Sequence, residues 1–126
     1  PLTIYSTSTI YSVNTNLDDL NGIIFTDAPW VIDQQTWLGN LPSLLRKYWP
    51  GDAIQSRQNA MGYDAYFLMA AINSMKNNYM EELNGATGQL FMEEDGKIRR
   101  RLAWAKLIDG KPKIQKRIQE VENLIY

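Results

Sequence analysis

The sequence predicts an α/β fold, and three features of the chain support this prediction. A continuous apolar run at residues 23–26 is typical of a strand covered on both faces in a parallel sheet. Apolar residues recur at helical spacing from Arg57 to Asn77, and an Asp-Gly pair separates two later strand-like runs. We therefore expect a mostly parallel sheet flanked by helices, with a late β-hairpin.

Size and composition indicate a single domain or a fragment of one, covering residues 1–126. The chain has a mass of 14.5 kDa, with 44% hydrophobic and 21% charged residues, as in globular proteins with a packed core. No apolar run approaches the roughly 20 residues that span a bilayer. Because the chain begins with Pro1 rather than Met, we expect a trimmed fragment whose targeting signal lies upstream.

The first half of the chain is predicted to contain two strands and two helices. Residues 2–5 form a short strand, and a polar loop and a turn lead to the second strand at residues 23–26, which ends at Asp27 before a proline. Apolar residues at helical spacing predict an amphipathic helix over residues 37–49, with Pro42 in the first turn of its main part. The clearest helical period follows over residues 57–77, where Gly62 indicates either a closely packed neighbour or a helix start nearby.

The second half is predicted to form a hairpin and then a helix. Residues 89–92 and 98–108 are the two strands, joined by a tight turn through residues 94–97. Asp-Gly at residues 109–110 closes the second strand. Apolar residues spaced by four, three and four positions from Ile114 predict a terminal amphipathic helix.

The composition argues against an enzyme. The chain has no Cys and no His, which excludes thiol nucleophiles, disulfides, the usual zinc sites and every triad that uses imidazole as a base. It also lacks a Ser-x-x-Lys motif, a Gly-x-Ser-x-Gly motif and the glycine-rich loops that hold nucleotides. We expect no catalytic residues, no metal and no cofactor.

Three residues are candidates for one wall of a ligand cleft. Asp27 and Trp30 follow directly after the predicted buried strand, where open α/β sheets bind ligands. Tyr63 lies in the segment with the strongest helical period and could face the same cleft. The simpler alternative is that Asp27 caps a turn, Trp30 belongs to the core, and the neighbouring Asp64 favours the positive end of its helix.

A basic segment offers a candidate surface for contact with a partner. Residues 1–96 carry a net charge of −7 and residues 97–126 a net charge of +6. In this basic segment Arg99, Arg100 and Trp104 are candidate contact residues, with Arg100 and Trp104 on the same side of the strand. The aromatic and basic faces do not coincide well enough for single-stranded nucleic acid, so we expect no nucleic-acid partner. In the alternative reading, Trp104 is core and the arginines pair with acidic residues elsewhere.

Three segments together resemble the end of the C-terminal domain of the LpoA (LppC-type) lipoproteins. They read LNGIIFTDAPWVI (Leu20 to Ile32), MGYDAYFLMAAI (Met61 to Ile72) and LNGATGQLFMEEDGKIRRRLAWAKLIDGK (Leu83 to Lys111). More broadly, the chain is similar to type I periplasmic solute-binding proteins, such as those for branched-chain amino acids. The resemblance covers residues 2–112 and implies the C-terminal portion of a two-lobed, periplasmic-binding-protein-like fold.

The resemblance also implies a function and a location. Proteins of this family look like periplasmic lipoproteins, anchored in the outer membrane, that activate a class A penicillin-binding protein, a peptidoglycan synthase of cell-wall biogenesis. Their lipid anchor would lie outside this chain, and they regulate an enzyme without being one. The alternative is a solute-binding receptor module for an amino acid or a peptidoglycan fragment, in which the three cleft candidates would contact the ligand.

Overall fold

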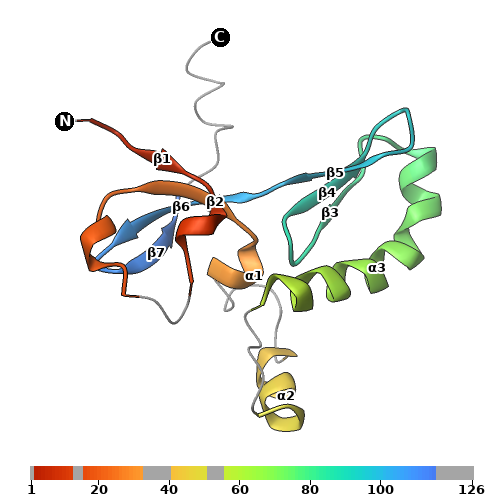
Figure 1. Cartoon of the computed structure of the whole chain (residues 1–126). Coiled ribbons are helices and arrows are strands. Elements are labelled where there is room, and N and C mark those ends of the chain that lie inside the picture. Colours follow the sequence, from red (N-terminus) through yellow and green to blue (C-terminus); the bar gives the residue numbers. More distant parts are fainter. Residues whose placement is uncertain (1, 13–15, 33–40, 51–55, 116–126) are drawn as a thin grey trace. The chain divides into compact units, whose positions relative to one another are not determined.

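The computed structural model describes residues 2–12, 16–32, 41–50 and 56–115 (Figure 1). Contacts within the chain divide it into two compact units. The first unit comprises Pro1–Asp27 and Ala103–Tyr126, and the second comprises Ala28–Leu102. Within the described residues, none of the helices combines the length and the apolar character needed to cross a membrane.

A four-stranded sheet forms the first unit. Its elements are β1 (Tyr5–Ser6), the 3-10 helices η1 (Ser8–Ile10) and η2 (Asp18–Leu20), β2 (Ile24–Asp27), β6 (Ala103–Ile108) and β7 (Lys111–Ile114). The strand order is β1-β2-β6-β7, and β1 and β2 are parallel. The pairs β2–β6 and β6–β7 are antiparallel, with Phe25 opposite Ala105.

The prediction of a mostly parallel sheet is therefore wrong. Among the described strands, β1–β2 is the single parallel pair, and the sheets are mixed or antiparallel. The apolar run at residues 23–26 does lie in a core, because Phe25 is fully buried and Ile24 is half-buried. Burial of a strand does not determine the direction of its neighbours, so the apolar pattern alone could not distinguish the two arrangements.

A two-residue turn joins β6 to β7. Ile108 pairs with Lys111, and between them Asp109 and Gly110 have φ angles of 54° and 74°. A type I′ hairpin turn requires positive φ at both central positions, and Asp-Gly is a favoured pair for it. The predicted terminal helix is thus wrong at its start, since Ile114 lies in edge strand β7. Residues 116–126, which would form the rest of that helix, lie outside the described residues.

In its described residues, the second unit contains three helices and a small antiparallel sheet. Its elements are α1 (Pro29–Ile32), α2 (Leu41–Tyr48), α3 (Arg57–Asn77), β3 (Glu82–Asn84), β4 (Gln89–Met92) and β5 (Ile98–Arg101). The sheet order is β3-β4-β5, and α3 packs against both α1 and β4. The buried apolar side chains of this unit come from α1 and the residue before it, from α3, from the loop after β3 and from β4: Ala28, Trp30, Val31, Ile32, Ala60, Met75, Ala86, Leu90 and Met92.

Helix α3 confirms the predicted bounds. Ser56 caps it, because the Ser56 hydroxyl accepts a hydrogen bond of 3.1 Å from the backbone N–H of Asn59. For α2, the structure confirms a helix with Pro42 in its first turn. The apolar positions Trp37 and Leu38, which the sequence placed in the same helix, lie outside the described residues.

The predicted hairpin is present, but its second strand is shorter than expected. Met92 pairs with Ile98, and Gly96 has a φ of 83° in the intervening turn. Strand β5 ends at Arg101, and after Leu102 the chain continues as β6 in the sheet of the other unit. The continuous run at residues 98–108 is therefore two strands in two sheets.

Candidate functional site

A buried carboxylate connects α3 to the loop between β3 and β4. Asp64 is only 4% exposed. Its side chain accepts hydrogen bonds from the backbone N–H groups of Ala86 (2.5 Å) and Thr87 (2.8 Å), and a further one from the Thr87 hydroxyl. Three donors satisfy a charge that would otherwise be costly to bury. Asp64 therefore holds this loop in place against the helix.

Two glycines let the loop between β3 and β4 approach its neighbours closely. A Cβ atom on Gly85 would lie 2.6 Å from an Asp64 carboxylate oxygen. Gly88 has a φ of +148°, and a Cβ there would lie 2.3 Å from the carbonyl oxygen of Arg101. The backbones of Gly85 and Gly88 close the loop by two mutual hydrogen bonds of 2.8 and 3.3 Å. The close contacts at these two positions explain why the Gly-Ala-Thr-Gly sequence of residues 85–88 has glycine at both ends.

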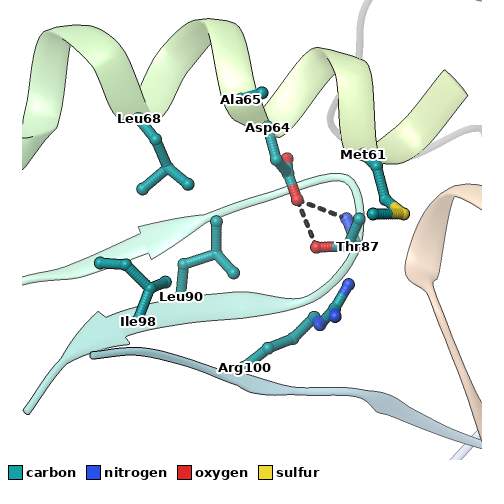
Figure 2. A pocket seen from close by; sticks show the side chains of 8 residues that line it. All are labelled: Met61, Asp64, Ala65, Leu68, Thr87, Leu90, Ile98 and Arg100. Atoms are coloured by element: carbon teal, nitrogen blue, oxygen red, sulfur yellow. Dashed lines mark hydrogen bonds between the residues drawn. The ribbon is translucent and has the colours of Figure 1, made fainter. Parts of the chain in front are cut away.

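A pocket of about 190 Å³ lies between α3 and the β4–β5 hairpin (Figure 2). Apolar side chains from both elements line one end of it, and Asp64, Thr87 and Arg100 gather at the other end. The complete lining is Met61, Asp64, Ala65, Leu68, Thr87, Leu90, Ile98 and Arg100. The pocket therefore combines an apolar wall with a polar end.

The three consecutive arginines of β5 have different environments. Arg99 pairs with Glu93 at 3.0 Å, and Arg101 pairs with Glu82 at 2.6 Å. The alternation of side chains along a strand turns Arg100 to the opposite face, where it lines the pocket. The alternative considered from the sequence, in which the arginines pair with acidic residues, thus describes Arg99 and Arg101.

Trp104, the third contact candidate, belongs to the first unit. Its ring packs edge to face on Tyr5, with the ring centroids 6.0 Å apart, and it is half-buried. The candidate contact residues are therefore divided between the two units, with Arg99 and Arg100 in the second.

The cleft candidates are divided in the same way. Asp27 lies in the first unit, at the end of β2, where it is buried and pairs in register with Ala103. Trp30 and Tyr63 lie in the second unit, where their rings stack with centroids 6.4 Å apart. Trp30 is 1% exposed, and neither ring lines the pocket beside Arg100.

The sequence interpretation did not assign Asp64 to this site. From the sequence, Asp64 was predicted to lie at the N-terminal end of its helix, where a negative charge is favourable. Helix α3 instead begins at Arg57, more than one turn before Asp64. One signal was present, because Arg57, Asp64 and Lys76 are the only charged residues in this 21-residue helix. A charge amid an apolar helix needs partners when it is buried, and Asp64 finds them in the Gly-Ala-Thr-Gly loop.

Comparison with known proteins identifies the family. The family model described as "LppC putative lipoprotein" matches residues 1–110. The chain belongs to the LppC lipoprotein family. Among curated LppC relatives, the penicillin-binding protein activator LpoA of Vibrio vulnificus is 31% identical over 105 residues, which are 82% of this chain and 17% of that protein. LpoA of Aliivibrio fischeri is 32% identical over 94 residues, covering 72% and 15%.

Solved structures of LppC-family relatives have the same fold. The chain matches full-length LpoA from Haemophilus influenzae with a TM-score of 0.72 and 26% identity, covering 92% of this chain and 22% of that one. The C-domain of the same protein, described as a regulator of PBP1A, gives a TM-score of 0.70 at 27% identity, covering 91% and 37%. A "putative branched-chain amino acid ABC transporter" from Chromobacterium violaceum gives 0.58 at 26% identity, covering 83% and 34%. The predicted likeness to periplasmic binding proteins is confirmed.

The chain spans less than a fifth of the length of these curated LppC relatives. Its similarity to the solved C-domain extends over about a third of that domain.

Proposed function

We propose that this chain is part of a non-enzymatic regulator that activates a class A penicillin-binding protein by direct contact. The observation that carries the proposal is membership of the LppC family, whose matched relatives are named penicillin-binding protein activators. The match to about a third of the solved C-domain supports a further proposal, that residues 1–126 are a part of such a domain. From the sequence resemblance we take them to be the C-terminal part of a two-lobed domain.

Activation by contact has a physical requirement. An activator shifts an enzyme toward its active conformation only if it binds that conformation more tightly than the inactive one. Equal affinity for both conformations would change nothing, however tight the binding. The regulator would therefore act as a binding surface. The family description supports a lipoprotein, and our proposal places it in the periplasm with its lipid anchor in the outer membrane.

The test is a titration of the complete natural protein against a purified class A penicillin-binding protein, with peptidoglycan cross-linking followed in the same samples. We expect saturable binding and a rise in cross-linking that follows the bound fraction. Binding without any change in synthase activity would contradict activation, and absence of binding by the folded protein would contradict the proposed partner.

A second candidate function is a receptor module for an amino acid or a peptidoglycan fragment. The similarity to the branched-chain amino acid transporter structure favours it. Asp27 in the first unit and Trp30 and Tyr63 in the second remain the predicted ligand contacts of this candidate function, and Asp27 and Trp30 are almost fully buried in this structure. A ligand at 100 times its dissociation constant adds about 2.7 kcal/mol to the free energy of unfolding. A melting experiment across amino acids and peptidoglycan fragments therefore tests this function, and an unshifted melting temperature would count against it.

A further inference from the structure

The pocket between α3 and the β4–β5 hairpin has an apolar end open to a ligand. Leu68 on α3 faces Leu90 and Ile98 on the hairpin, and Met61 lies at the opposite end, 57% exposed (Figure 2). The volume of about 190 Å³ is several times the roughly 30 Å³ that one water molecule occupies in the liquid. The pocket therefore has room for an apolar side chain.

Arg100 supplies the charge at the polar end. Among the described residues, Glu93 and Glu82 pair with Arg99 and Arg101, and no carboxylate lies within ion-pair distance of Arg100. The stem of Arg100 passes close to the loop, since a Cβ atom on Gly88 would lie 3.0 Å from the Arg100 Cγ. A guanidinium stays protonated at every physiological pH and binds carboxylates through two parallel hydrogen bonds.

The carboxylate of Asp64 does not prevent Arg100 from binding an anionic group at the polar end of the pocket. This carboxylate shares the polar end of the pocket, but it already accepts hydrogen bonds from both Ala86 and Thr87 and is almost fully buried. Arg100 is exposed to solvent. An incoming group would therefore meet the guanidinium of Arg100 before the satisfied carboxylate of Asp64.

We propose that this pocket docks a segment of the partner protein in which an apolar side chain stands next to an Asp or Glu. The apolar side chain would lie against Leu68, Leu90 and Ile98, and the carboxylate would pair with Arg100. This inference rests on the proposed function, because the partner is the penicillin-binding protein. The positive charge of Arg100 favours an acidic segment over a basic one in this pocket.

The first test uses Arg100→Ala in the complete natural protein, with Arg101→Ala as the matched control. Hydrogen bonds to charged groups contribute enough that we expect affinity for the penicillin-binding protein to fall about tenfold or more for Arg100→Ala. Arg101→Ala, which removes a cation already paired with Glu82 outside the pocket, should change affinity less than about threefold. Equal affinities for the two variants would overturn the docking site and leave the proposed function standing. Failure of the unmodified protein to bind would overturn the proposed function itself.

A second test fills the pocket from α3. Ala65 lines it and is exposed, whereas Ala70 is exposed on the same helix outside the lining. We expect Ala65→Phe to weaken partner binding about tenfold and Ala70→Phe to leave it unchanged. Two other occupants would overturn the proposal. If Ala65→Phe lowers the melting temperature and Ala70→Phe does not, another part of the same protein fills the pocket. If Ala65→Phe changes the sedimentation coefficient of the protein, a second copy fills it.

Discussion

Asp64 is the side chain on which the loop between β3 and β4 depends. Replacing it with alanine would leave two backbone N–H groups and the Thr87 hydroxyl buried without their acceptor. We expect Asp64→Ala to lower the free energy of unfolding by about 3 kcal/mol or more. Urea unfolding followed by circular dichroism measures this change, with the exposed Asp19→Ala as the control. A change no larger than that of the control would mean that water replaces the carboxylate.

Two glycine-to-alanine substitutions should have opposite effects. At Gly85 the new methyl group would press on the Asp64 carboxylate, which three hydrogen bonds hold in place, so we expect lower stability. At Gly62 a methyl group would meet no atom of the described residues within 4 Å. Gly62→Ala should therefore raise stability by about 0.5 to 1 kcal/mol, because alanine favours the helix. Melting temperatures of both variants measure the contrast, and a destabilising Gly62→Ala would reveal a neighbour at that position.

At the scale of the element, the turn between β4 and β5 carries a titratable group. The side chain of Lys97 lies 2.9 Å from the Asp95 carboxylate, and the Lys97 backbone N–H donates to it at 3.0 Å. These hydrogen bonds lower the pKa of Asp95 below its ordinary value of 3.8. The carboxylate therefore favours the folded turn above its ordinary pKa, and this contribution is lost as the pH falls through the lowered pKa. In an NMR titration, Lys97→Ala should raise the pKa of Asp95, and an unmoved pKa would contradict the pairing.

Helix α3 separates what periodicity can predict from what it cannot. The predicted bounds were right because the apolar spacing is a local signal. The apolar positions at that spacing are not equally buried, since Met75 is fully buried and Met61 is 57% exposed. Spacing identifies which residues share a face, but the elements that pack against the face determine how much of it is covered.

At the scale of the whole molecule, the sequence predicted the elements better than their pairing. Residues 98–108 have the composition of one strand, yet Leu102 separates a strand of one sheet from a strand of another. Ile114 continues a helical spacing but lies in β7, because the Asp109–Gly110 turn returns the chain to β6. Both outcomes depend on partners distant in the sequence, which local patterns do not contain.

The candidate site, too, depends on contacts between distant parts of the sequence, which local patterns could not predict. The resemblance included Gly-Tyr-Asp-Ala at residues 62–65 and Gly-Ala-Thr-Gly at residues 85–88, but nothing local indicated that the two motifs contact each other. The hydrogen bonds from the loop to Asp64 span more than 20 positions of the chain. Arg100 was a contact candidate because of its charge and because the strand pattern placed it on the same side as Trp104. The structure adds that the neighbouring Arg99 and Arg101 are paired with glutamates.

The contact between Gly85 and Asp64 has a consequence for the evolution of this family. Because a side chain at position 85 would occupy the space of the carboxylate, the two positions are not free to vary independently. Homologues that keep an aspartate at position 64 should keep glycine at position 85, and those with a larger residue at 85 should have lost the aspartate. Co-variation of these two columns across LppC sequences would record this constraint, and frequent larger residues at position 85 beside a retained aspartate would refute it.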